Sequence, residues 1–283
     1  MVLESLINPF KAKKKPWELF FIGIVYSSVA LLLSNWVFKE QASLLMVFFT
    51  TMACIPLIIS ATKEEEELVS AEPSEKKLLV EHAKTIKFLL YLFLGFVIAF
   101  VFWYVVLPSG TIKGLFHTQT ITIQSINARA LLGFSVKLSA FNSIFFNNLK
   151  VMMFCILFSF LYGAGAIFIL SWNASVIATA IGNFIRTNLS SYASALGFQK
   201  FGAYMHIISV GLLKYAIHGL PEILAYFVAG LAGGIISVAL IRENFRTKAF
   251  TKALLDSSDL IIIAVLLVFI AALFEVFITP LIF

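Results

Sequence analysis

Long apolar segments are the feature of this sequence that most limits its fold. Residues 17–38, 42–61 and 88–107 hold almost no charge, and about 20 residues of helix cross a hydrocarbon core about 30 Å thick. Of the 283 residues, 60% are hydrophobic and only 13% are charged, whereas roughly a quarter are charged in soluble domains. A transmembrane β-barrel would instead show short segments of alternating polarity. The sequence therefore predicts an all-α, polytopic transmembrane helical bundle.

The positive charge of the chain is better explained by membrane topology than by nucleic acid. The net charge is +6, but Lys and Arg lie at the ends of apolar segments and form no stripe interleaved with exposed aromatic residues. Cys54 and Cys155 each lie inside an apolar segment and form no metal-binding pattern. We therefore expect no nucleic acid, metal or cofactor, and a lipid bilayer as the immediate partner.

The N-terminal half is expected to hold three spans. Residues 1–16 form a basic amphipathic start that the positive-inside rule places in the cytoplasm of a multi-pass cell-membrane protein. Three spans follow within residues 17–107, the first two joined by a tight external hairpin. The most polar stretch, residues 62–87, is expected to be a solvated cytoplasmic loop with a helix that enters the third span; an acidic face that docks a partner is the alternative.

The second half is less regular. Residues 108–148 are too long for a plain loop and too polar for a clear span, so we expect an external region with interfacial helices. The C-terminal membrane region, residues 149–283, then opens with a span near residues 151–172. After Asn173, polar residues recur at spacings of three and four, which predicts an amphipathic helix at the membrane surface; the alternative is a polar interior.

The apolar segment from about residue 204 to 241 is too long to be one simple span. Gly219 suits the end of a helix and Pro221 suits the first turn of the next, so we predict a break between them. Lys214 and His218 would then lie at a negative helix end and Glu222 at a positive one. The first piece is expected to be short or re-entrant. Six spans result if the segment crosses once, and seven with an external C-terminus if it crosses twice.

Three interpretations are open for Lys214, His218 and Glu222. They could stabilise a buried break by pairing with one another or with Asn148, Asn173 or Glu275, the last of which lies in the final span. They could instead line a path for a solute or ion. Intramembrane metal or acid–base catalysis is the weakest interpretation, because no third ligand stands at a recognisable spacing. We expect no catalytic residue and a structural or polar intramembrane site.

An ordered set of residues between about 143 and 240 resembles the stage II sporulation protein M family. The pattern has an Asn that opens a span, a Gly-rich middle, an Asn before an amphipathic helix, and an HG..E element followed by small residues. The matching residues are Asn148, Gly163, Gly165, Asn173, Gly182, His218, Gly219, Glu222, Ala229 and Gly233. The chain departs at Ala174, where the family usually has Gly. The N-terminal half is similar to archaeal-type members.

The resemblance implies a non-enzymatic role. In endospore-forming bacteria the family member is similar to a scaffold that holds cell-wall-degrading partners at a septal membrane. Members also occur where there is no peptidoglycan, so those partners do not carry over. The sequence thus favours a membrane scaffold or membrane-remodelling protein with unidentified membrane or envelope partners, and self-association is left open. A channel or small-solute transporter with a polar site at Lys214, His218 and Glu222 is the alternative.

Overall fold

The protein is helical throughout the part of the chain that the structure describes. A computed structural model describes residues 15–70, 75–127, 134–162, 166–190, 197–242 and 247–282. The elements are α3 (Trp17–Val37), α4 (Ala42–Ser70), α5 (Glu75–Val106), α6 (Ser109–Leu115), α7 (His117–Asn127), α8 (Phe134–Tyr162), α9 (Ala166–Ser190), α10 (Gly197–Arg242), α11 (Lys248–Leu273), η1 (Phe274–Ile278) and α12 (Thr279–Ile282). The predicted all-α bundle is confirmed.

Seven stretches within the described ranges are long and apolar enough to cross a membrane. They are Trp17–Val37, Ala42–Ala61, Val80–Val106, Lys137–Phe160, Ala166–Leu189, Gly202–Ile241 and Lys248–Ile282. If each of these stretches crosses the bilayer once, the two ends of the described chain lie on opposite sides of it. That the N-terminal side is cytoplasmic stays a prediction.

The first three spans pack through a close approach of two backbones. A Cβ atom on Gly23 of α3 would collide with the Leu92 carbonyl of α5, and one on Gly95 would collide with the Phe20 carbonyl. Trp103 adds a hydrogen bond from its indole nitrogen to the hydroxyl of Ser28, at 2.9 Å. Small residues are used in the same way at helix interfaces in lipid, where van der Waals packing drives association.

The predicted loop at residues 62–87 is largely helical. α4 continues to Ser70 and α5 begins at Glu75, so residues 71–74 alone separate the two helices. Near the start of α5 the buried ring of His82 lies 3.0 Å from Asp256 of α11 and shares a hydrogen bond with it. This bond joins α5, in the first half of the chain, to α11.

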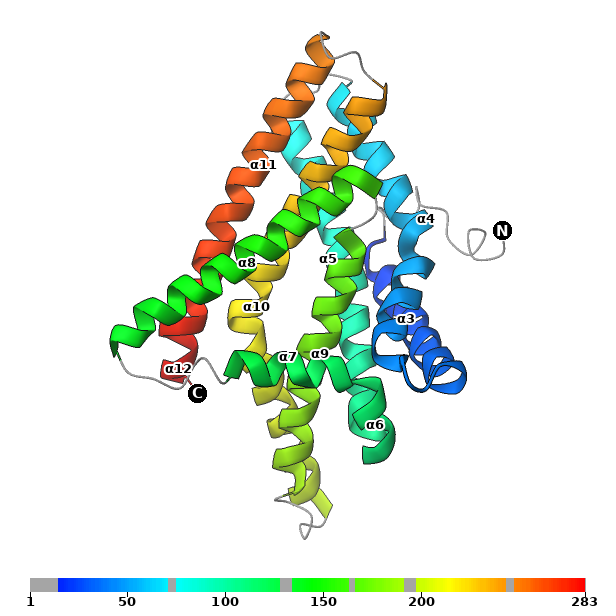
Figure 1. Ribbon diagram of the computed structural model, residues 1–283, viewed down its shortest axis with the longest axis vertical. Helices are drawn as coiled ribbons and strands as arrows, with labels where there is room; N and C mark the ends of the chain where they lie inside the picture. The colour runs from blue at the N-terminus through cyan, green and yellow to red at the C-terminus, as the bar shows by residue number, and fades with distance from the viewer. Residues whose placement is uncertain are drawn as a thin grey trace.

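The region at residues 108–148 contains two short helices and the beginning of a span. α6 and α7 occupy its first part, and α7 runs across α9 partway along that helix (Figure 1). α8, however, starts at Phe134 and reaches Tyr162 without interruption. The fourth span is therefore shifted toward the N-terminus relative to the predicted residues 151–172.

The helix predicted to lie at the membrane surface after Asn173 is instead part of α9, which lies within the bundle. α9 is long and apolar enough to be a span, and its polar residues Ser175 and Thr179 are buried. They face the bundle because α9 packs against α5, α10 and α4. The alternative of a polar interior describes this helix correctly.

α10 is the central helix of the bundle. It runs almost the whole height of the molecule, and α8 crosses it obliquely while α11 lies beside it (Figure 1). In the most apolar part of the α10 span Gly202–Ile241, 78% of the residues are buried inside the bundle. The corresponding share for the α8 span Lys137–Phe160 is 22%. Four of the predicted site residues, Lys214, His218, Gly219 and Glu222, therefore lie on the most enclosed helix.

Candidate functional site

The break predicted between Gly219 and Pro221 does not exist. α10 is one helix of 46 residues with Pro221 in its interior, so Lys214, His218 and Glu222 do not lie at helix ends. A proline leaves one carbonyl, that of Ile217, without its helical N–H partner. Ending a helix inside a bilayer would leave several such groups unsatisfied. The continuous helix is therefore the less costly solution.

Gly219 also differs from its predicted role. It has a helical backbone, with no positive φ, and a Cβ atom at this position would meet nothing within 4 Å. Neither a turn nor a close approach of another backbone thus requires glycine here. No described contact explains why this position is part of the family pattern.

His218 and Glu222 are held by side chains that the sequence analysis did not single out. The buried Tyr226 hydroxyl donates to Glu222 Oε1 at 2.7 Å, one helical turn along α10. His218 Nδ1 and Thr279 Oγ1 lie 3.3 Å apart and share a hydrogen bond from α10 to α12. The i, i+4 spacing of Glu222 and Tyr226 was a visible signal, whereas nothing in the sequence linked His218 to residue 279.

Glu275 belongs to the same cluster. It lies on η1, a single π-helical turn between α11 and α12, and it is close enough to Glu222 and Tyr226 for their charges to interact. A π turn widens a helix locally and often marks a functional position. That Glu275 pairs with the α10 residues stays a prediction. The structure brings together two carboxyl groups, a phenol, an imidazole and a hydroxyl.

Lys214 is separate from this cluster. Its ammonium group lies 5.7 Å from the centre of the Phe184 ring on α9, within the usual range of a cation–π contact. The family pattern, which includes His218 and Glu222 but not Lys214, agrees with this division.

The two predicted asparagines lie elsewhere as well. Asn173 on α9 donates to the carbonyl of Ile169 at 2.8 Å, within its own helix. Asn148 on α8 is buried, and its Nδ2 has no hydrogen-bond partner in the described part of the chain. Its Oδ1 accepts a long bond of 3.5 Å from Asn147. Neither asparagine side chain is bonded to the cluster of His218 and Glu222 among the described residues.

Several glycines of the family pattern make helix crossings. A Cβ atom on Gly233 would lie 2.5 Å from the carbonyl oxygen of Ile156 on α8, and one on Gly182 would lie 2.5 Å from the Tyr104 ring. Gly163 and Gly165 lie outside the described residues. The small side chains thus set the distance between α10 and α8 and between α9 and α5.

Two anchoring residues were missed from the sequence. The fully buried Gln119 on α7 donates to the carbonyl of Ser43 on α4 and to the hydroxyl of Ser175 on α9, at 3.0 and 3.1 Å. Arg186 on α9 donates to the carbonyls of Tyr104 and Leu107 at the end of α5. A lone Gln or Arg in a mixed-polarity stretch gave no signal, because its partners are more than 50 residues away.

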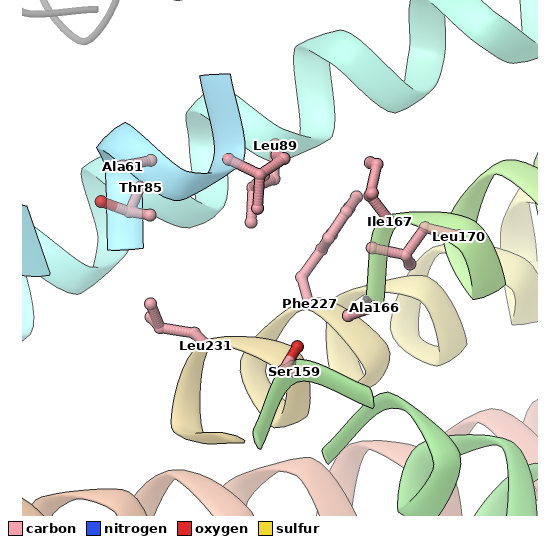
Figure 2. Close-up of a pocket in the computed structure, with 11 residues that line it drawn as sticks. Ala61, Thr85, Leu89, Ser159, Ala166, Ile167, Leu170, Phe227 and Leu231 are labelled. Carbon is pink, nitrogen blue, oxygen red and sulfur yellow. The ribbon is translucent and has the colours of Figure 1, made fainter. Parts of the chain in front are cut away.

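A small cavity of about 30 Å3 lies at another place in the bundle. In Figure 2 it is surrounded by α4, α5, α8, α9 and α10, with Phe227 beside it and the hydroxyl groups of Thr85 and Ser159 as polar members. Such a volume suits one or two water molecules. Neither His218 nor Glu222 lines it.

The cluster can exchange hydrogen bonds but offers no recognised ligand set. Among the described residues, no group of three or more His, Cys, Asp or Glu side chains is placed to hold a metal ion. What the arrangement does is join α10 to α12 through the hydrogen bond between His218 and Thr279.

A comparison with protein families agrees with the sequence pattern. The family model described as Stage II sporulation protein M matches residues 88–280, which is more than half of the chain. No curated protein and no solved structure matches. The chain belongs to the stage II sporulation protein M family.

Proposed function

We propose that this member of the stage II sporulation protein M family is a non-enzymatic scaffold that organises other proteins in a cell membrane. The observation that carries the proposal is how the family residues are used. Gly233 and Gly182 make helix crossings, and His218 and Glu222 bond to Thr279 and Tyr226. Family residues that pack helices together or bond within the bundle support a protein whose task is to keep a defined shape in the membrane.

The position of the family residue Glu222 inside the bundle also supports this proposal. Glu222 is bonded within its own helix, and the cavity of Figure 2 lies along a different part of α10, beside Phe227 and Leu231. A transported solute needs a route to the polar site. The short helices α6 and α7 add polar and apolar surface at one end of the bundle, where interfacial helices respond to lipid packing.

The test compares assembly with transport in the same protein. The full chain, extracted from its native membrane in polymer-bounded lipid discs, is expected to retain other membrane proteins at a fixed ratio. Reconstituted alone into liposomes, it is expected to give no flux of ions or small solutes. Isolation as a lone chain together with measurable flux would contradict the scaffold proposal.

A channel or small-solute transporter is the second candidate, and one observation favours it. Glu222 and Glu275 place two interacting carboxyl groups beside Pro221 and a π turn, within apolar spans. Intramembrane ionisable groups at irregular helices are used by transporters. On this proposal Glu222→Gln abolishes a flux that the wild-type protein shows, while Lys214→Gln, which changes a residue outside the cluster, leaves it.

A further inference from the structure

The outward face of α8 carries a row of polar side chains. Its members are exposed and recur at spacings of one, three and four residues, which places them on one side of the helix. They are Ser139, Asn142, Ser143, Asn147 and Lys150, and we call them the polar face of α8. The opposite side, with Met152 and Cys155, is buried against the bundle.

This face differs from the polar positions that bond within their own helix or lie inside the bundle. In other spans Ser27, Ser34, Thr50, Thr51 and Thr179 bond the carbonyl four residues earlier. Ser171 and Ser257 have no partner among the described residues, but both are buried. Within the described ranges, the polar face has no side-chain hydrogen bond or ion pair other than the 3.5 Å contact of Asn147. The donors and acceptors of this face are therefore available to bond a group outside the described part of the chain.

Contacts of α8 place this face at hydrocarbon depth. The Phe141 ring packs on Phe269 of α11 at 5.4 Å between centroids, and Phe269 is about 20 Å of helix from the end of that span at Ile282. Further along α8, Ile156 touches Gly233 of the central helix. Lys150 lies between these two contacts. Asn and Ser are too short to reach the headgroups, and a charge at this depth is unfavourable without a partner.

The polar groups on this face indicate which kind of partner can bind there. Asparagine and serine exchange hydrogen bonds with a neighbouring transmembrane helix, and the ammonium group of Lys150 requires a carboxylate. A second copy is disfavoured, because two α8 helices related by a two-fold axis would bring Lys150 toward its own equivalent, and like charges repel. Glu222 and Glu275 of a second copy are enclosed in its own bundle.

We propose that the polar face of α8 binds a transmembrane helix of another membrane protein, and that this helix carries an aspartate or glutamate at the depth of Lys150. The proposal rests on the scaffold function, since it names the surface through which the scaffold holds a partner. The apolar residues that continue the same side of α8, Met153 and Leu157, are exposed and extend the contact.

The experiment places a photo-crosslinking phenylalanine analogue at Phe146, an exposed residue on the same side of α8 as the polar face, in the full chain in native membranes. Phe21 on α3 is the matched control, because both phenylalanines are 56% exposed. Crosslinked products are identified by mass spectrometry. Phe146 is expected to capture a membrane protein through a helix that contains Asp or Glu, and Phe21 is expected to capture lipid.

A charge exchange completes the test. Lys150→Glu is expected to lower the crosslinking yield by about tenfold or more, as expected for one lost partner of a buried charge pair, and replacement of the partner's acidic residue by Lys is expected to restore it. Crosslinking of Phe146 to lipid, to a second copy, or to a helix without an acidic residue overturns the proposal.

The same scan separates this proposal from the scaffold function. If Phe146 captures no protein but another outward position does, the α8 assignment fails and the scaffold proposal stands. If outward positions on all seven spans capture lipid alone, both fail.

Discussion

α8 and α10 cross each other at Ile156 and Gly233, yet they handle polar residues in opposite ways. On α10, the most buried span, Glu222 and His218 each have a bonded partner. On α8, the least buried span, Asn142, Ser143 and Lys150 have none among the described residues. The difference suggests that α10 holds the bundle together, whereas α8 presents its polar groups to something outside the chain.

The largest expected effect tests the crossing itself. Gly233→Leu puts a side chain where even a Cβ atom would lie 2.5 Å from a backbone oxygen, so the helices must separate, at a cost of ~3 kcal/mol or more. Thermal unfolding in detergent measures the loss. Gly202→Leu on the same helix, where a Cβ meets nothing within 4 Å, is the control and should unfold near the wild-type temperature. Equal stability of the two variants would show that α8 and α10 do not depend on a close approach at Gly233.

The next effect tests whether the polar cluster stabilises α10. Glu222→Ala leaves the buried Tyr226 hydroxyl without its acceptor and should cost about 1–3 kcal/mol of unfolding free energy. Added to Tyr226→Phe, the same change should cost much less, because the pair is then already broken. Additive losses in this double-mutant cycle would show that the bond contributes nothing.

Gly219→Ala is expected to raise stability slightly. The added methyl group meets open space, and alanine is favoured over glycine within a helix by ~0.5–1 kcal/mol. A lower unfolding temperature would mean that α10 does break at this position in the membrane. The variant therefore tests the continuous helix directly.

The smallest effect is expected on the polar face of α8. Lys150→Gln should change the unfolding free energy of the isolated protein by no more than about 0.5 kcal/mol, because the side chain is exposed and unpaired within the chain. The same thermal unfolding assay applies. A clear destabilisation would show that Lys150 has an internal partner, and the contrast between α8 and α10 would disappear.

The sequence by itself determined the fold class, most of the spans and the residues of the family pattern. Apolar segments of about 20 residues have one stable form in lipid, so residues 17–37 and 42–61 could be assigned from hydropathy alone. Two of the five residues of the polar cluster, His218 and Glu222, were likewise recognisable from an HG..E element inside an apolar run.

Tertiary structure alone decided how those elements are used. Gly219 and Pro221 predicted a break from local preference, but α10 packs against α8, α9 and α11 and stays helical, because lipid offers no partner for freed backbone groups. The polar spacing of α9 was compatible with a surface or an interior position, and contacts with α5 and α10 decided for the interior. The partners Thr279 and Gln119 come from distant segments, and a linear pattern carries no information about such contacts.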